Sequence, residues 1–145
     1  MSDPYSEMSQ VQIDAFLEVP RFAIVATNRA DGPPQLTPVW YIYQGRKIYF
    51  STYMKSAKYK NLSRDPRVGI CITGDNPDAR SVSIYGKTEF TPQGNDRADE
   101  IIWNLTRRYY NSDDDTRSYL DIAAANGNSV LAMVSPETVI AYDFN

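Results

Sequence analysis

The chain of 145 residues is long enough for one domain with a buried core, because 42% of its residues are hydrophobic and only 23% are charged. Its net charge of −3 argues against a general nucleic-acid-binding role, and its longest apolar runs are too short and too polar to span a membrane. The N-terminal segment lacks the basic start and apolar stretch of a signal peptide, and the single cysteine excludes an intrachain disulfide. We therefore expect a single domain over residues 1–145 and, by default, a cytoplasmic location.

The first half of the chain is expected to alternate short helices and strands. Ser9 is a suitable N-cap for a helix over residues 10–18, which Pro20 ends. The side chains expected to face inward from this helix are Val11, Ile13, Phe16 and Leu17. The elements expected next are strands over 21–28, 35–44 and 47–52 and a helix of about two turns over 56–65.

The second half continues with strands and contains two longer helices. The expected elements are strands over 67–73 and 80–90, helices over 96–110 and 112–127, and two final strands over 129–134 and 138–144. Five or more strands, mostly joined by short hairpins, favour a mainly β fold. We expect a small antiparallel β-barrel with helices packed against its outside.

Histidine is absent from the sequence, and this limits the catalytic and metal-binding mechanisms that the protein can use. Histidine is the commonest general base and the commonest metal ligand, so a hydrolase with a catalytic histidine is excluded and a zinc site nearly so. We expect no metal site. If the protein is an enzyme, a bound cofactor is expected to carry its chemistry.

Hydroxyl and lysine side chains gather where the strand over 47–52 ends. Ser51 and Thr52 close the strand, and a cluster of three lysines follows, Lys55, Lys58 and Lys60. Lys55, Ser56 and Lys58 lie close to the start of the next helix. Hydroxyls, ammonium groups and a helix N-terminus together favour an anion such as phosphate. The ordinary alternative is a set of solvated surface lysines with no ligand.

Pro38 interrupts a sequence that otherwise reads as a strand. Proline removes a backbone donor, so this strand is expected at an edge, at a bulge, or where the backbone faces a ligand. Tyr41 and Tyr43 should point to one face of the strand and Trp40 to the other. For the two tyrosines a place in the core or in a dimer contact is the better interpretation. A flat heteroaromatic ring against Pro38 and Val39 is the functional alternative.

The stretch "DGPPQLTPVWYIYQGRKIYFSTYMKSAKYKNLSRDPRVGICIT", residues 31–73, resembles the pyridoxamine 5′-phosphate oxidase-like split β-barrel flavoproteins. The pattern is G-x-P, TPVW, ST, K, NL and DPRV in that order, and the branch that it resembles most is the short deazaflavin-dependent one. The resemblance implies a split antiparallel β-barrel with flanking helices. It also implies a homodimer with a flavin-type cofactor in a groove at the subunit interface.

The resemblance assigns cofactor-binding roles residue by residue. It implies that Ser51 and Thr52 contact the phosphate or ribityl chain, that Lys58 pairs with the phosphate, and that Ser56 adds a hydroxyl. It implies that Thr37, Pro38 and Val39 line the tricyclic ring through backbone contacts. No catalytic residue is assigned: Tyr41, Tyr43 and bound water all remain open as the proton donor.

The leading functional hypothesis is an oxidoreductase that transfers a hydride between the deazaflavin coenzyme F-420 and a small organic molecule. One alternative keeps the fold and binds FMN, with an oxidase or flavin-reductase activity. A second is a non-catalytic carrier of a flavin or deazaflavin, and a third is a structural protein with an empty groove. The motif does not separate F-420 from FMN, because both carry a phosphate on a similar ribityl chain.

Overall fold

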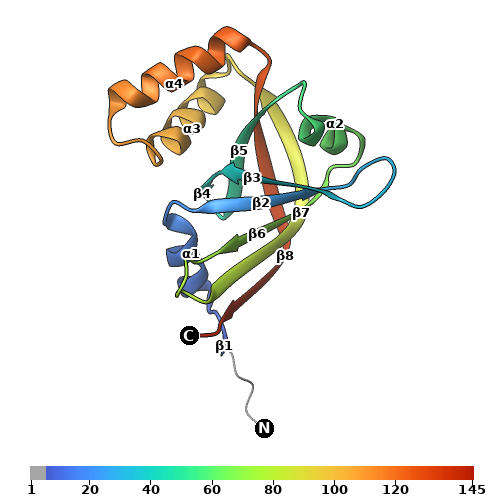
Figure 1. The fold of residues 1–145 in the computed structure, drawn as a ribbon, viewed down its shortest axis with the longest axis vertical. Coiled ribbons are helices and arrows are strands. Elements are labelled where there is room, and N and C mark those ends of the chain that lie inside the picture. The colour runs from blue at the N-terminus through green and yellow to red at the C-terminus, as the bar shows by residue number, and fades with distance from the viewer. Residues whose placement is uncertain (1–5) are drawn as a thin grey trace.

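An eight-stranded antiparallel sheet, curled into a half-barrel, organises residues 6–145, the part of the chain that the computed structural model describes (Figure 1). The strands lie in the order β3-β2-β6-β7-β8-β5-β4, with β1 beside β8. Their bounds are β1 Ser6–Glu7, β2 Phe22–Thr27, β3 Gln35–Trp40, β4 Ile42–Gln44, β5 Lys47–Tyr53, β6 Arg67–Thr73, β7 Arg80–Pro92 and β8 Ser129–Asp143. The predicted mainly β, split-barrel fold is confirmed.

The helices flank the sheet and begin at residues that cap them. They are α1 Gln10–Glu18, α2 Ala57–Arg64, α3 Asp96–Arg107 and α4 Asp113–Asn126. Ser9 and Gln12 form a capping box at α1, since each side chain accepts the backbone N–H of the other. The bounds predicted for α1 and β6 are those observed, because a cap and a run of alternating apolar residues are local signals. Val11 is an error of the prediction: it is 78% exposed on the outer side of α1.

The strand predicted over 35–44 is broken at Tyr41, which is fully buried. Its hydroxyl lies 3.1 Å from the carbonyl oxygen of Leu17 and 3.0 Å from that of Val19. Its own backbone N–H donates to the hydroxyl of Tyr109, and its carbonyl accepts from the guanidinium of Arg108. Side chains from beyond α3 therefore take the backbone groups that a continuous strand would have given to a neighbouring strand.

The two strands predicted over 129–134 and 138–144 form one strand, β8. Pro136 lies inside it, paired with Gly86, where the register of β7 and β8 shifts by a bulge between Tyr85 and Gly86. A Cβ on Gly86 would collide with the backbone of Ser135, so only glycine permits this close approach. The bulge accommodates Pro136, which lies between the two strands that the sequence predicted.

The main core fills the concave side of the half-barrel. Its largest fully buried side chains are Tyr41, Phe16, Phe50, Leu17, Ile48, Ile72 and Ile84. A second, smaller cluster joins Ala98, Ile101 and Ile102 of α3 to Tyr49 of β5 and Leu131 of β8. This second cluster holds α3 beside β5, and that contact sets the position of the pocket described below.

β3 is an edge strand, because it pairs with β2 and with no other strand in the sheet. Pro38 therefore lies at an edge, which is one of the three places that its missing backbone donor allowed. Within residues 6–145, none of the helices combines the length and the apolar character that a membrane crossing needs.

Candidate functional site

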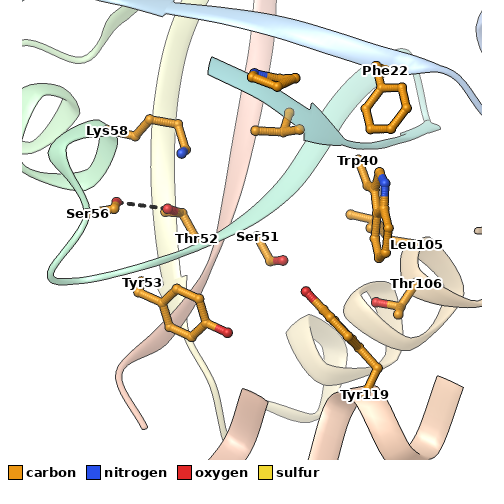
Figure 2. A pocket seen from close by; sticks show the side chains of 12 residues that line it. Phe22, Trp40, Ser51, Thr52, Tyr53, Ser56, Lys58, Leu105, Thr106 and Tyr119 are labelled. Atoms are coloured by element: carbon orange, nitrogen blue, oxygen red, sulfur yellow. Dashed lines mark hydrogen bonds between the residues drawn. The ribbon is translucent and has the colours of Figure 1, made fainter. Parts of the chain in front are cut away.

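A pocket of about 310 Å³ lies where the edge strand β3, the end of β5, the start of α2 and the helices α3 and α4 approach one another (Figure 2). The residues that line it are Phe22, Pro38, Val39, Trp40, Ser51, Thr52, Tyr53, Ser56, Lys58, Leu105, Thr106 and Tyr119. They come from segments separated by up to about a hundred positions in the chain. The pocket is therefore a product of the tertiary fold.

Six of the seven residues predicted as a cofactor site lie together in this pocket. These six are Pro38, Val39, Ser51, Thr52, Ser56 and Lys58. Thr37 is not among the lining residues. It is paired with the fully buried Val25, so its side chain faces the core, and its Oγ1 is buried without a hydrogen-bond partner.

The polar end of the pocket is formed by Thr52, Ser56 and Lys58. The hydroxyls of Thr52 and Ser56 are hydrogen-bonded at 2.8 Å, and Ser56 Oγ also accepts the backbone N–H of Tyr59 at 3.1 Å as the N-cap of α2. The first N–H groups of a helix have no acceptor within the helix. The N-terminus of α2 therefore offers backbone donors beside these hydroxyls.

Lys58 carries the ammonium group of this polar end. Its side chain is half-buried and directs Nζ into the pocket (Figure 2). Among residues 6–145, no carboxylate forms an ion pair with it. Burial lowers the pKa of Lys58, since removal from water disfavours the charged form. A bound anion would relieve this cost.

The other two lysines of the cluster lie elsewhere. Lys60 is exposed on α2, and Lys55 borders a neighbouring hollow with Asn126, Gly127 and Asn128. That hollow shares Tyr53 and Ser56 with the pocket, so the two spaces are adjacent. Of the three lysines in the sequence cluster, only Lys58 turns into the pocket.

The opposite end of the pocket is aromatic. Trp40 stacks on Tyr109 with ring centroids 4.9 Å apart and planes 8° apart. Tyr110 meets Trp40 edge-on at 5.6 Å, and Tyr119 meets it at 5.6 Å with a tilt of 47°. The sequence analysis placed the side chains of Trp40 and Tyr41 on opposite faces of their strand but did not include Trp40 in the site. The sequence offered no signal for Tyr119. The alternation along β3 was the available clue for Trp40, because Pro38 and Trp40 share a face.

The aromatic end is tied to the rest of the fold by the residues that follow α3. The hydroxyl of Tyr109 donates to the carbonyl oxygen of Arg21 at 2.6 Å and accepts the N–H of Tyr41 at 3.1 Å. The guanidinium of Arg108 donates to the carbonyl oxygens of Tyr41 and Glu18 at 2.6 and 2.7 Å. Burial raises the pKa of Tyr109, so its hydroxyl stays protonated at neutral pH.

The two tyrosines considered as proton donors lie outside the pocket lining. Burial raises the pKa of Tyr41 to about 12, and its hydroxyl is engaged by backbone carbonyls of the α1 region. Tyr43 donates to the carboxylate of Asp14 at 2.6 Å, and burial and this hydrogen bond raise its pKa. Both side chains contribute to packing around α1, in agreement with the place in the core that the sequence analysis gave as one of its two preferred interpretations.

A curled antiparallel sheet with a pocket between its edge strand and a capped helix is the architecture of a split β-barrel. The family model described as pyridoxamine 5′-phosphate oxidase matches residues 10–142, and the chain belongs to this family. The match extends from the first residue of α1 almost to the end of β8.

Solved structures share this fold. A conserved hypothetical protein from Mycobacterium tuberculosis is 26% identical with a TM-score of 0.80, over 95% of this chain and 86% of that chain. An F-420 reductase is 24% identical with a TM-score of 0.65, over 87% and 94%. A FAD-binding protein from Mesorhizobium loti is 19% identical with a TM-score of 0.67, over 96% of each chain. At these last two identities the likeness concerns the fold alone.

Proposed function

We propose that this protein is an oxidoreductase that binds the deazaflavin coenzyme F-420 in the pocket and transfers a hydride between it and a small organic acceptor. The observation that carries the proposal is the half-buried ammonium of Lys58, which faces the pocket with no carboxylate partner among residues 6–145. A cation in such a place is stabilised by a ligand that brings a negative charge.

The residues of the polar end fit a phosphate group. Lys58 supplies a charge, Thr52 and Ser56 supply hydroxyls, and the N-terminus of α2 adds backbone donors with a favourable helix dipole. F-420 and FMN both carry such a phosphate. FMN, with an oxidase or flavin-reductase activity, is therefore the alternative to F-420 at this site.

The middle of the pocket fits a flat heteroaromatic ring. β3 is an edge strand, so backbone N–H and C=O groups on its free side are not used by the sheet. Pro38 and Val39 of this strand line the pocket. When bound, the cofactor would supply the hydride, and the protein would contribute by orienting the rings and keeping water away from them.

A second copy of the chain is proposed to complete the pocket. One row of residues crosses the outer face of the sheet, because Ile24 pairs with Pro38 and Cys71, Cys71 with Ser83, and Ser83 with Ile140. This row carries no charge. Beside it lie further exposed apolar side chains, of which Phe22 is 62%, Leu36 64% and Tyr85 52% exposed. Such a face is typical of a protein interface.

The size of the pocket also supports a dimer. Ligand pockets generally measure about 300–1,000 Å³, so this pocket is at the small end of the range. Phe22, Pro38 and Trp40 belong both to the pocket and to the outer face of β2 and β3. A partner seated on that face would therefore deepen the pocket as well as cover the apolar surface.

The test is a fluorescence titration of the purified protein with F-420 and with FMN, followed by an assay of hydride transfer. Tighter binding of F-420 supports the proposal, and tighter binding of FMN supports the alternative. Binding without transfer to any acceptor would identify a carrier protein. If neither cofactor binds, both enzyme proposals fail.

A further inference from the structure

The two ends of the pocket differ in chemistry. Lys58 and the hydroxyls of Thr52 and Ser56 make one end polar, whereas Trp40 and Tyr119 make the other end aromatic. Figure 2 shows Lys58 and Trp40 on opposite sides of the pocket. No carboxylate is among the lining residues, and the single charge lies at the polar end. The aromatic end therefore suits an uncharged molecule.

Trp40 is held as a rigid wall of this aromatic end. One face of its ring is covered by Tyr109, 4.9 Å away and nearly parallel, and Tyr110 blocks it edge-on at 5.6 Å. Tyr109 is itself fixed by hydrogen bonds to backbone groups of Arg21 and Tyr41. The indole thus has little freedom to turn aside when a ligand enters.

Tyr119 forms the second wall. It comes from α4, is 39% exposed, and projects into the pocket in Figure 2. Its ring meets that of Trp40 at 47° with centroids 5.6 Å apart. The two rings are too close for a third ring to pass between them, so they form an aromatic corner, defined here as Trp40 and Tyr119. A flat ring laid against one wall meets the other wall obliquely or by its edge, which are favourable aromatic arrangements.

We propose that the aromatic corner is the acceptor subsite and selects planar, conjugated, uncharged molecules over saturated ones of the same size. This inference rests on the proposed function, since it presumes that an acceptor enters beside the cofactor. A cofactor whose phosphate is held at Lys58 would have its ring beside Pro38 and Val39, and the corner beyond them would stay open to the acceptor.

The test uses Trp40 as its own reporter. The sequence contains two tryptophans, and Trp103 is not among the pocket residues, so Trp103→Phe leaves Trp40 as the sole tryptophan. This variant, without cofactor, is titrated with 1,4-naphthoquinone, which is flat, and with decalin-1,4-dione, which has the same carbon skeleton but is saturated and puckered. We expect the quinone to quench the fluorescence of Trp40 in a saturable way. Binding of the dione is measured by calorimetry, and we expect it to be at least tenfold weaker.

Three variants in the Trp103→Phe background distinguish the contribution of the Tyr119 ring to binding from the contributions of its hydroxyl and of the helix that carries it. Tyr119→Leu should weaken naphthoquinone binding about two- to tenfold, the ratio that corresponds to one aromatic contact. Tyr119→Phe keeps the ring and should bind as the parent does. Ile122→Ala alters an exposed position of the same helix, outside the pocket, and should have no effect.

Equal affinity for the flat and the puckered compound would overturn the inference, as would a Tyr119→Leu variant that binds like its parent. The titration is repeated with F-420 or FMN bound, following the fluorescence of the cofactor. Displacement of the cofactor by naphthoquinone would also overturn it, because the corner would then hold the cofactor ring. A protein that binds neither F-420 nor FMN but still prefers the flat compound would refute the proposed function. It would leave the preference of the aromatic corner standing.

Discussion

Removal of the charge at position 58 tests the phosphate assignment directly. Lys58→Met keeps an apolar side chain of similar length and shape in this half-buried position and removes the ammonium. A charge-assisted hydrogen bond contributes about 1.5–3 kcal/mol, so we expect the dissociation constant of F-420 or FMN to rise about tenfold to 150-fold. The variant protein without cofactor should be no less stable than the wild type, because the ammonium is desolvated and has no carboxylate partner in residues 6–145.

The assay is a thermodynamic cycle with two ligands that differ only in phosphate. FMN and riboflavin are titrated against the wild type and against Lys58→Met, at low and at moderate salt. We expect the variant to lose affinity for FMN and to keep its affinity for riboflavin, and we expect salt to weaken FMN binding mainly in the wild type. Lys60→Ala, an exposed lysine on the same helix, serves as the control. An equal loss for FMN and riboflavin would refute a contact between Lys58 and phosphate.

Three further predictions concern the assembly, the bulge and the response to acid. Leu36→Glu puts a charge on the apolar outer face and should shift a dimer to monomer in light scattering; a monomeric wild type would contradict the proposed assembly. Gly86→Ala should lower the free energy of unfolding, measured by urea titration, by about 1–3 kcal/mol, because the added Cβ meets the backbone of β8. Gly69→Ala is the control and should cost much less, because a Cβ there would make ordinary contacts. The guanidinium of Arg80 holds the pKa of Asp78 well below its usual range, so this pair stabilises the fold above about pH 4 and the stabilisation is lost as the pH falls further. Asp78→Asn should therefore flatten the dependence of the free energy of unfolding on pH below about pH 4. An unchanged dependence would refute the assignment.

Elements whose signals are local could be predicted from the sequence. The predicted cap at Ser9 marks the start of α1, the helix predicted from residue 56 begins one residue later as α2, and alternating apolar residues mark β6. Pro38 by itself narrowed its strand to an edge, a bulge or a ligand-facing stretch, since a missing backbone donor is a property of one residue, and the edge is the alternative that the structure shows. The cluster around Lys58 likewise predicted the polar end of the pocket, because its members follow one another closely in the chain.

Features that depend on distant partners could not be read in this way. The break at Tyr41 exists because Arg108 and Tyr109 take its backbone groups, and they follow it by more than sixty positions. β8 continues past Pro136 because a bulge at Gly86 accommodates it. In both cases a local sequence pattern was overruled by hydrogen bonds and packing from another element.

The sequence by itself determined the class of fold and narrowed the place of Pro38 to an edge, a bulge or a ligand-facing stretch of backbone. It also predicted the polar character of the end of β5, because the hydroxyl and lysine side chains there follow one another within a few residues of the chain. The family resemblance singles out Lys58 among the lysines, whereas only the tertiary structure decided that Tyr119 of α4 meets Trp40 in the pocket. The physical reason is that a pocket wall requires side chains to approach within a few ångströms in space, and chain proximity specifies that approach only inside a single element.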